Sequence, residues 1–165
     1  MKHSWRLFLI MLALSACASG STKVILPKTT TAIFSTAQIQ HSQDAVSVPA
    51  DITQRFESKL KELLFVSDGF QPGTDLTVAY RFIEYDPGSR LRRYMIGFGA
   101  GKGEVTVEMS FKDAAGNELA KIENGGEISM GFFGGSIDQA IDEMAKKSAA
   151  YANANFRAPK PGGKS

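Results

Sequence analysis

Residues 104–112 alternate between apolar and polar side chains, with Val105, Val107, Met109 and Phe111 on one side. This period of two predicts a strand with one buried and one solvated face, which is typical of an antiparallel sheet. The β-branched and aromatic run at 76–85 predicts a second strand. Residues 118–123 are expected to pair back on the first strand through a hairpin in which Gly116 supplies the left-handed position.

The remaining extended segments carry weaker signals. Residues 23–27 are compatible with a first strand, and residues 29–43, rich in Thr, Ser and Gln, fit either a strand or an irregular extended segment. The pair Gly125-Gly126 indicates a bulge or bend, after which residues 127–130 continue that strand or start another.

Two stretches show the spacing of amphipathic helices. At 51–66 apolar residues recur every three or four positions, with Asp51 as the N-cap and Gln54 completing a capping box. At 136–156 the side chains of Ser136 and Gln139 form the same motif ahead of a second apolar stripe. The expected fold class is therefore α+β, an antiparallel sheet of about four or five strands with two main helices packed on one face.

The beginning of the chain differs from the rest. Lys2 and Arg6 come before an apolar run of ten residues, half of what spans a bilayer. A basic start followed by a short apolar stretch is typical of a secretory signal peptide. The letters LSAC that end at Cys17 resemble the lipobox of bacterial lipoproteins. This resemblance makes residues 1–16 a lipoprotein signal peptide and Cys17 the lipidated residue.

A lipid on Cys17 determines where the protein is expected to be. Acyl chains such as palmitate contribute about 0.8 kcal/mol per buried CH₂, so two or three chains form a lasting membrane anchor. Ala18 and Ser19 follow the cysteine where an aspartate would indicate inner-membrane retention, which favours the periplasmic face of the bacterial outer membrane. We expect a lipidated tether at 17–22, a single periplasmic α+β domain at 23–156 and a disordered tail at 157–165.

Charge argues against one class of partner. The chain has 19 basic and 17 acidic side chains, but two of the basic ones lie in the signal peptide, which leaves 17 of each in the mature chain. A nucleic-acid binder usually carries a basic excess on its domain. We therefore expect no nucleic-acid partner.

The most distinctive stretch is RLRRYMIGFGAGKG at 90–103, with a glycine at every second position near its end. It does not fit a phosphate loop, because Ile96 stands where the first glycine belongs and no Ser or Thr follows the lysine. Alternating glycines indicate one bare face of a strand, or a loop entering one, where a partner can approach closely. The candidate contacts are Arg90, Arg92, Arg93, Gly97, Phe98, Gly99, Gly101 and Lys102.

These candidates also have plainer interpretations. The glycines fit a purely local backbone role, and the three arginines fit a solvated loop after the turn at 86–88. As a binding group, arginine suits a bidentate grip on a headgroup phosphate or on the carboxylate of an acidic partner. Phe132 and Phe133 lie between glycines. Their rings could either fill the core just ahead of the second helix or form an exposed docking patch.

Groups that support catalysis are sparse. His41 is the one histidine outside the signal peptide, and a histidine with no cysteine partner does not make a metal site. The sequence has no Gly-x-Ser-x-Gly elbow. We predict no enzyme activity, no metal and no cofactor other than the covalent lipid. A cleft in which Glu104 and Glu108 converge on Arg93 would revive the enzyme hypothesis.

The stretch RYMIGFGAGKGEVTVEMSFKDAAGNE at 93–118 resembles the signature of an uncharacterised bacterial lipoprotein family, domain of unknown function 4410. In outline it has an Arg, a Gly-Phe-Gly-x-Gly run, an alternating strand and an Asp-x-x-Gly turn, and the later Gly-Gly before the final helix also fits. The resemblance covers about residues 23–156. It implies a small α+β envelope domain and no catalytic residues.

Two functions without catalysis stay open. The first is a lipid-anchored accessory module that binds a protein partner in the cell envelope. The second is a small-ligand or lipid carrier, in which the apolar side of the 104–112 strand encloses a cavity under the helices. A filled core would count against the carrier.

Overall fold

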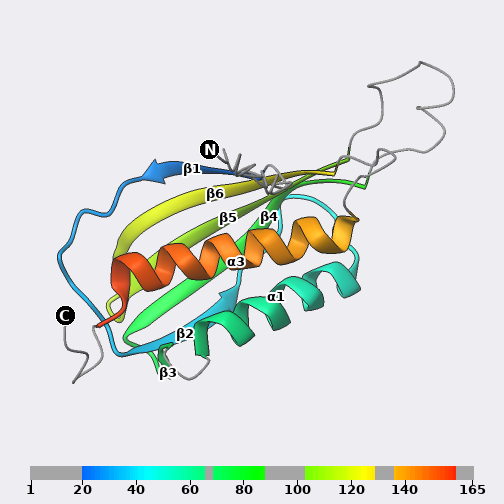
Figure 1. Cartoon of the computed structure of the whole chain (residues 1–165). Coiled ribbons are helices and arrows are strands. Elements are labelled where there is room, and N and C mark those ends of the chain that lie inside the picture. Colours follow the sequence, from blue (N-terminus) through cyan, green and yellow to red (C-terminus); the bar gives the residue numbers. More distant parts are fainter. Residues whose placement is uncertain (1–19, 66–68, 88–102, 129–135, 159–165) are drawn as a thin grey trace, which may run out of the picture.

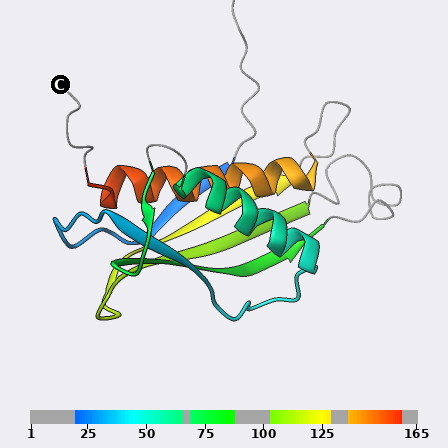
Figure 2. The same ribbon diagram turned by 90° about the horizontal axis from the view of Figure 1, so that it is seen from below.

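The computed structural model describes residues 20–65, 69–87, 103–128 and 136–158. A six-stranded sheet carries two helices on one face and leaves the other face open (Figures 1 and 2). The elements in chain order are β1 (Gly20–Leu26), β2 (Thr36–His41), α1 (Ala50–Phe65), β3 (Gln71–Pro72), β4 (Leu76–Asp86), β5 (Gly103–Asp113), β6 (Glu118–Ile128) and α3 (Ile137–Phe156).

The sheet is mixed, in the order β1-β6-β5-β4-β2-β3. The strands β1, β6, β5 and β4 are antiparallel to one another in this order, as predicted. However, β2 runs parallel to β4 and β3 runs parallel to β2, so the prediction of a purely antiparallel sheet of four or five strands is wrong. The physical reason is that α1 returns the chain to the end of the sheet where β2 began, so the next strands run in the same direction.

The two helices begin close to the predicted positions. In α3 the hydroxyl of Ser136 accepts from the amide of Gln139 at 3.3 Å, and the Gln139 side chain accepts from the Ser136 amide at 3.1 Å. The predicted capping box is thus confirmed. In α1 the helix already begins at Ala50, so Asp51 lies within the first turn and not at the N-cap. There the carbonyl of Pro49 accepts the amide of Ile52 at 3.1 Å.

Several boundaries differ from the prediction. β1 begins at Gly20, inside the segment expected to be a tether. β6 runs on to Ile128, and its pairing with β5 shows no irregularity at Gly125-Gly126, so the predicted bulge there is wrong. A methyl group at Gly126 would already touch the Cβ of Ala140 at 3.4 Å, because α3 lies directly over this part of the strand. The predicted left-handed residue is confirmed, since Gly116 has a φ of 85°.

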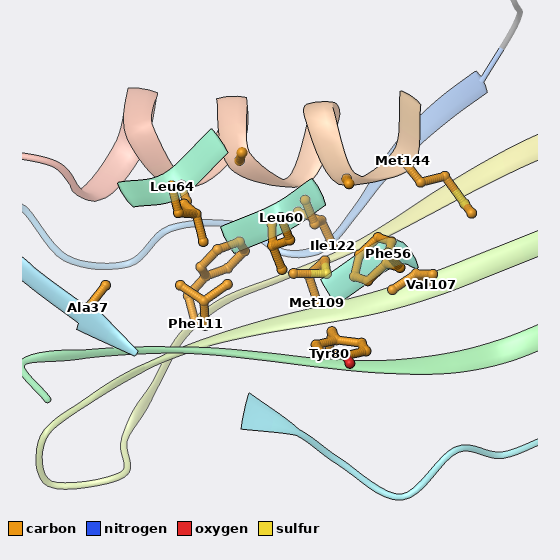
Figure 3. Packing of buried hydrophobic residues seen from close by; sticks show 14 of the residues in the cluster. Ala37, Phe56, Leu60, Leu64, Tyr80, Val107, Met109, Phe111, Ile122 and Met144 are labelled. Atoms are coloured by element: carbon orange, nitrogen blue, oxygen red, sulfur yellow. The ribbon is translucent and has the colours of Figure 1, made fainter. Parts of the chain in front are cut away.

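The core fills the space between the helices and the sheet (Figure 3). The apolar side of β5 faces the helices, and its side chains from Val105 to Phe111 are fully buried, as the alternation predicted. The stripe of α1 that meets them consists of Ile52, Phe56, Leu60 and Leu64. At the far end, the amide of Ala158 donates to the carbonyl of Phe34 at 2.9 Å, so the expected tail is bound to the domain at its start.

A polar contact between Asn124 and Ser148 is sealed in this core. Asn124 of β6 is fully buried and donates from its side-chain amide to the hydroxyl of Ser148 in α3 at 2.8 Å. Its carbonyl oxygen accepts from the hydroxyl of Thr22 in β1 at 2.6 Å. A buried polar side chain is tolerated only with its partners in place, so this bridge fixes how β1, β6 and α3 sit together.

Candidate functional site

Several strands begin or end at one end of the sheet. Asp86 ends β4 beside the start of β5, and Gly103 starts β5 opposite Ile128, the end of β6. Gly20 starts β1 opposite Gly126, also near the end of β6. We call this the anchor end, defined by the starts of β1 and β5 and the ends of β4 and β6 (Figure 1).

The candidate residues from the sequence all lie outside the described residues. They are Cys17, Arg90, Arg92, Arg93, Gly97, Phe98, Gly99, Gly101, Lys102, Phe132 and Phe133. Their points of attachment are nevertheless fixed, because residues 87–102 connect β4 to β5 and residues 129–135 follow β6. Cys17 comes three residues before β1. All of the candidate segments therefore join the domain at the anchor end. The glycine run leads into β5, an interior strand between β6 and β4.

The described part of the anchor end is acidic and aromatic. The hydroxyl of Thr106 donates to Glu84 at 3.2 Å on the open face of the sheet. Burial raises the pKa of the Tyr85 hydroxyl, and the negative charge of Asp51 at the start of α1 raises it further. Glu104 is exposed here.

Glu108, one of the two carboxylates of the enzyme hypothesis, already forms an ion pair. Glu108 accepts from the Nε of Arg81 at 2.8 Å on the open face, and its side chain is only 14% exposed. This contact raises the pKa of the Arg81 guanidinium. Glu108 is therefore committed to a cross-strand pair, while Arg93, with which the hypothesis combined it, lies outside the described residues.

A shallow hollow of about 310 Å³ lies on the open face of the sheet. Its floor contains Ala79 and Ser110, which are directly opposite each other on β4 and β5. Charged side chains surround them: Arg81, Glu108, Lys112, Glu118 and Lys121. Lys121 pairs with Glu118 at 3.3 Å, so the rim carries charges of both signs.

A larger cleft of about 540 Å³ lies beside β2 on the helix side of the sheet, which we call the β2 cleft. It runs between the exposed flank of α1 and the segment that follows β2. Its lining is mostly polar and consists of His41, Asp44, Val48, Ala50, Thr53, Gln54, Glu57, Ser58 and Lys61.

His41 is firmly held at this cleft. Its ring stacks on that of Tyr80 with centroids 4.6 Å apart and planes 4° apart. Its Nε2 lies 3.0 Å from Asp44, whose carboxylate also accepts the amide of Phe82 at 2.8 Å. The segment after β2 is thereby attached to β4. The sequence singled out His41 only as a poor metal ligand, and the His-x-x-Asp spacing was the available signal for this contact.

A second set of polar contacts joins two lining residues of the β2 cleft, Glu57 and Lys61, to Tyr80. The hydroxyl of Tyr80 donates to Glu57 of α1 at 2.8 Å, and Lys61 lies 2.5 Å from the same carboxylate. The hydrogen bond from Lys61, followed by that from Tyr80, holds the pKa of Glu57 below its ordinary range. Burial, with the contact to Glu57, raises the pKa of Tyr80 far above its ordinary range. The hydroxyl therefore remains a donor at any physiological pH.

The described residues contain neither a cluster of metal ligands nor a membrane-spanning helix. Among them, no three His, Cys, Asp or Glu side chains are grouped so that they could hold a metal ion. Within the same ranges, no helix is both long and apolar enough to cross a membrane.

The chain is similar to a family of known sequences and to solved structures. A family model described as domain of unknown function 4410 matches residues 21–131. A PelC dodecamer from Paraburkholderia phytofirmans is similar at a TM-score of 0.52 and 11% identity, over 86% of this chain and 100% of that one. A minor lipoprotein from Acinetobacter baumannii gives a TM-score of 0.43 and 16% identity, over 79% and 99% of the two chains. No curated protein matches.

Proposed function

We propose that this chain, which belongs to the family described as domain of unknown function 4410, is a lipid-anchored, non-catalytic accessory module of the bacterial envelope. It would be held by acyl chains on Cys17, at the periplasmic face of the outer membrane, and would bind a protein partner. The observation that carries this proposal is the anchor end, where the candidate anchor and both candidate contact segments join the domain.

Chain length supports a membrane-facing anchor end. A residue spans at most about 3.6 Å, so Cys17 lies within about 11 Å of the start of β1. Arg90 is four residues beyond Asp86, and Phe132 is four residues beyond Ile128, which puts each within about 14 Å of the anchor end. Lipidation of Cys17 would therefore bring arginines and phenylalanines close to headgroup phosphates and to any protein at the membrane surface.

A protein partner is favoured by the connection between β4 and β5. These strands are paired up to Asp86 and Glu104, where a tight hairpin would suffice, yet residues 87–102 connect them. Connections of this length inside a compact domain are uncommon, and they are usually either functional loops, such as binding loops, or linker segments. PelC, which shares the fold, is described as a dodecamer, which supports protein–protein contact as a use of this fold.

The carrier alternative receives less support. A carrier would need a cavity lined by the apolar side of β5. This side packs against the helices, and its residues are each 0% exposed: Val105, Val107, Met109 and Phe111. The hollow on the open face and the β2 cleft are both lined mainly by polar side chains and contain none of these four residues. The accessory role is therefore the function that we propose.

The test is crosslinking in cells, followed by membrane extraction and mass spectrometry, with Cys17→Ala as the unanchored control. We expect wild type to take up a labelled palmitate analogue and to capture a defined protein, and the control to lose both. Charge reversal at Arg90, Arg92 and Arg93 should reduce capture while lipidation continues. Capture that is unchanged by the reversal would remove the arginines from the site, and lipidated protein without any captured partner would overturn the accessory role.

A further inference from the structure

The two edges of the sheet are both open over part of their length. β1 pairs with β6 on one side, and no described strand lies on its other side. At the opposite edge, β3 covers only Thr36 and Ala37 of β2. The rest of β2, residues 38–41, therefore has no strand on its outer side within the described chain. An open edge presents backbone groups that another strand can pair with.

The β1 edge also exposes apolar side chains. Only three large hydrophobic side chains are exposed in the described residues, and two of them, Val24 at 51% and Ile25 at 41%, lie on β1. Val24 is opposite the buried Ile122 of β6, so it points to the helix side of the sheet. With about half of its surface exposed, Val24 is an incompletely covered continuation of the core.

The two open edges are at the same level of the sheet. Val24 is opposite Ile122, Ile122 opposite Met109, Met109 opposite Tyr80, and Tyr80 beside His41. This row crosses the whole domain from the exposed part of β1 to the open part of β2. A neighbouring copy placed beside the first would thus bring Val24 to the level of His41 without a vertical shift.

Strand direction selects one way of joining copies. β1 runs away from the anchor end, whereas β2 is parallel to β4 and runs toward it. Side-by-side copies that stand the same way up therefore place β1 of one antiparallel to β2 of the next. Antiparallel pairing of two β1 strands about a two-fold axis would instead put the two anchors at opposite ends. If Cys17 is lipidated as proposed, one membrane cannot hold both anchors of such a pair.

We infer that the partner of the β1 edge is a second copy of this chain, whose open stretch of β2 it extends. Val24 then packs against the ring of His41 at the β2 cleft. This cleft has a volume of about 540 Å³, and the apolar side chain of Val48 also lines it. Each added copy leaves a free β1 at one side and a free β2 at the other. Such a head-to-tail contact produces a closed ring or a row of copies in the membrane plane.

The inference rests on the proposed anchor, and engineered thiols test the two separately. Ile25 lies at the register shift between Val24 and Leu26 of β1, next to Val24, so Ile25→Cys would come close to Gln40→Cys in this pairing. Both positions are exposed. With the full chain in its membrane, a short bismaleimide should give a ladder of dimers, trimers and larger species from the double variant. Wild type, with Cys17 acylated, should give none. Neither single variant should give a ladder.

Every other outcome has a defined meaning. Dimers alone from the Ile25→Cys single variant would indicate β1–β1 pairing and overturn the inference. Folded, membrane-bound double variant without crosslinks would do the same. Adding Val24→Asp to the double variant should reduce the ladder at least tenfold, whereas Ser110→Asp on the open face should not. If the chain is found in the soluble fraction, the anchor fails. The purified double variant that also carries Cys17→Ala, at high concentration, then still decides the pairing.

Discussion

The two faces of the sheet are made by the same strands and yet are held by different forces. On the helix side, β5 presents four fully buried apolar residues to α1 and α3. On the open side, the alternate residues of the same strand form charged and polar pairs with β4, such as Arg81 with Glu108. Burial of apolar area is the main source of folding stability, while exposed pairs contribute at most about 1 kcal/mol. The helix side therefore maintains the fold, and the open side can change at little cost.

The strongest way to break this contrast is a cavity on the helix side. Phe56 is fully buried on α1 and touches the rings of both Tyr80 and Phe82. We expect Phe56→Ala to lower the free energy of unfolding by about 3–5 kcal/mol, because it leaves a cavity that rigid neighbours cannot fill. Urea denaturation monitored by circular dichroism measures this. A loss below about 1 kcal/mol would mean that the helix side is loosely packed.

A smaller loss is expected from the polar bridge within the core. Asn124→Ala removes the acceptor of Thr22 and the donor to Ser148. We expect a cost of about 1–3 kcal/mol, since buried polar groups lose their partners. The variant Asn124→Asp keeps the acceptor for Thr22 but not the donor, and buries a charge in the same place. If denaturation shows that Asn124→Asp is more stable than Asn124→Ala, water reaches the site.

These effects show which parts of the fold are visible in the sequence. The alternation of β5, the stripe of α1 and the capping box of α3 follow from local spacing, so sequence predicts them well. The parallel placement of β2 depends on where α1 leads the chain, which no local pattern records. The cluster of His41, Tyr80 and Glu57 joins three separate segments and was likewise hidden. The candidate contact residues stay predictions.

At the β2 cleft we expect a loss of stability that is smaller than on the helix side and larger than on the open face. Glu57 has a lowered pKa, so it stays charged in the folded state at pH values where the unfolded chain binds a proton. Its stabilising effect is thus present above the ordinary carboxyl range and is lost as the pH falls through the lowered value. We expect Glu57→Gln to lose stability at neutral pH and to show a flatter acid limb. Melting curves of both proteins from neutral to acid pH check this, and parallel curves would refute it.

The smallest effect is expected on the open face. Arg81 is 42% exposed and forms its ion pair with Glu108 in contact with solvent. Arg81→Ala should lower the free energy of unfolding by less than about 1 kcal/mol, and less still in high salt. A matched double-mutant cycle with Glu108→Ala isolates the pair. A coupling above about 2 kcal/mol would erase the contrast between the faces.

The antiparallel pairing of β1 with β6 has a mechanical consequence. If Cys17 carries the lipid, any pull between membrane and domain enters through Gly20 and acts along the strand axis. The backbone hydrogen bonds between β1 and β6, from Gly20 to Leu26, are then loaded together in shear and do not break one after another. The bridge from Thr22 to Asn124 carries part of that load directly into the buried core. The domain is thus attached through one of its mechanically resistant directions, which suits a protein that keeps a partner fixed against a fluid surface.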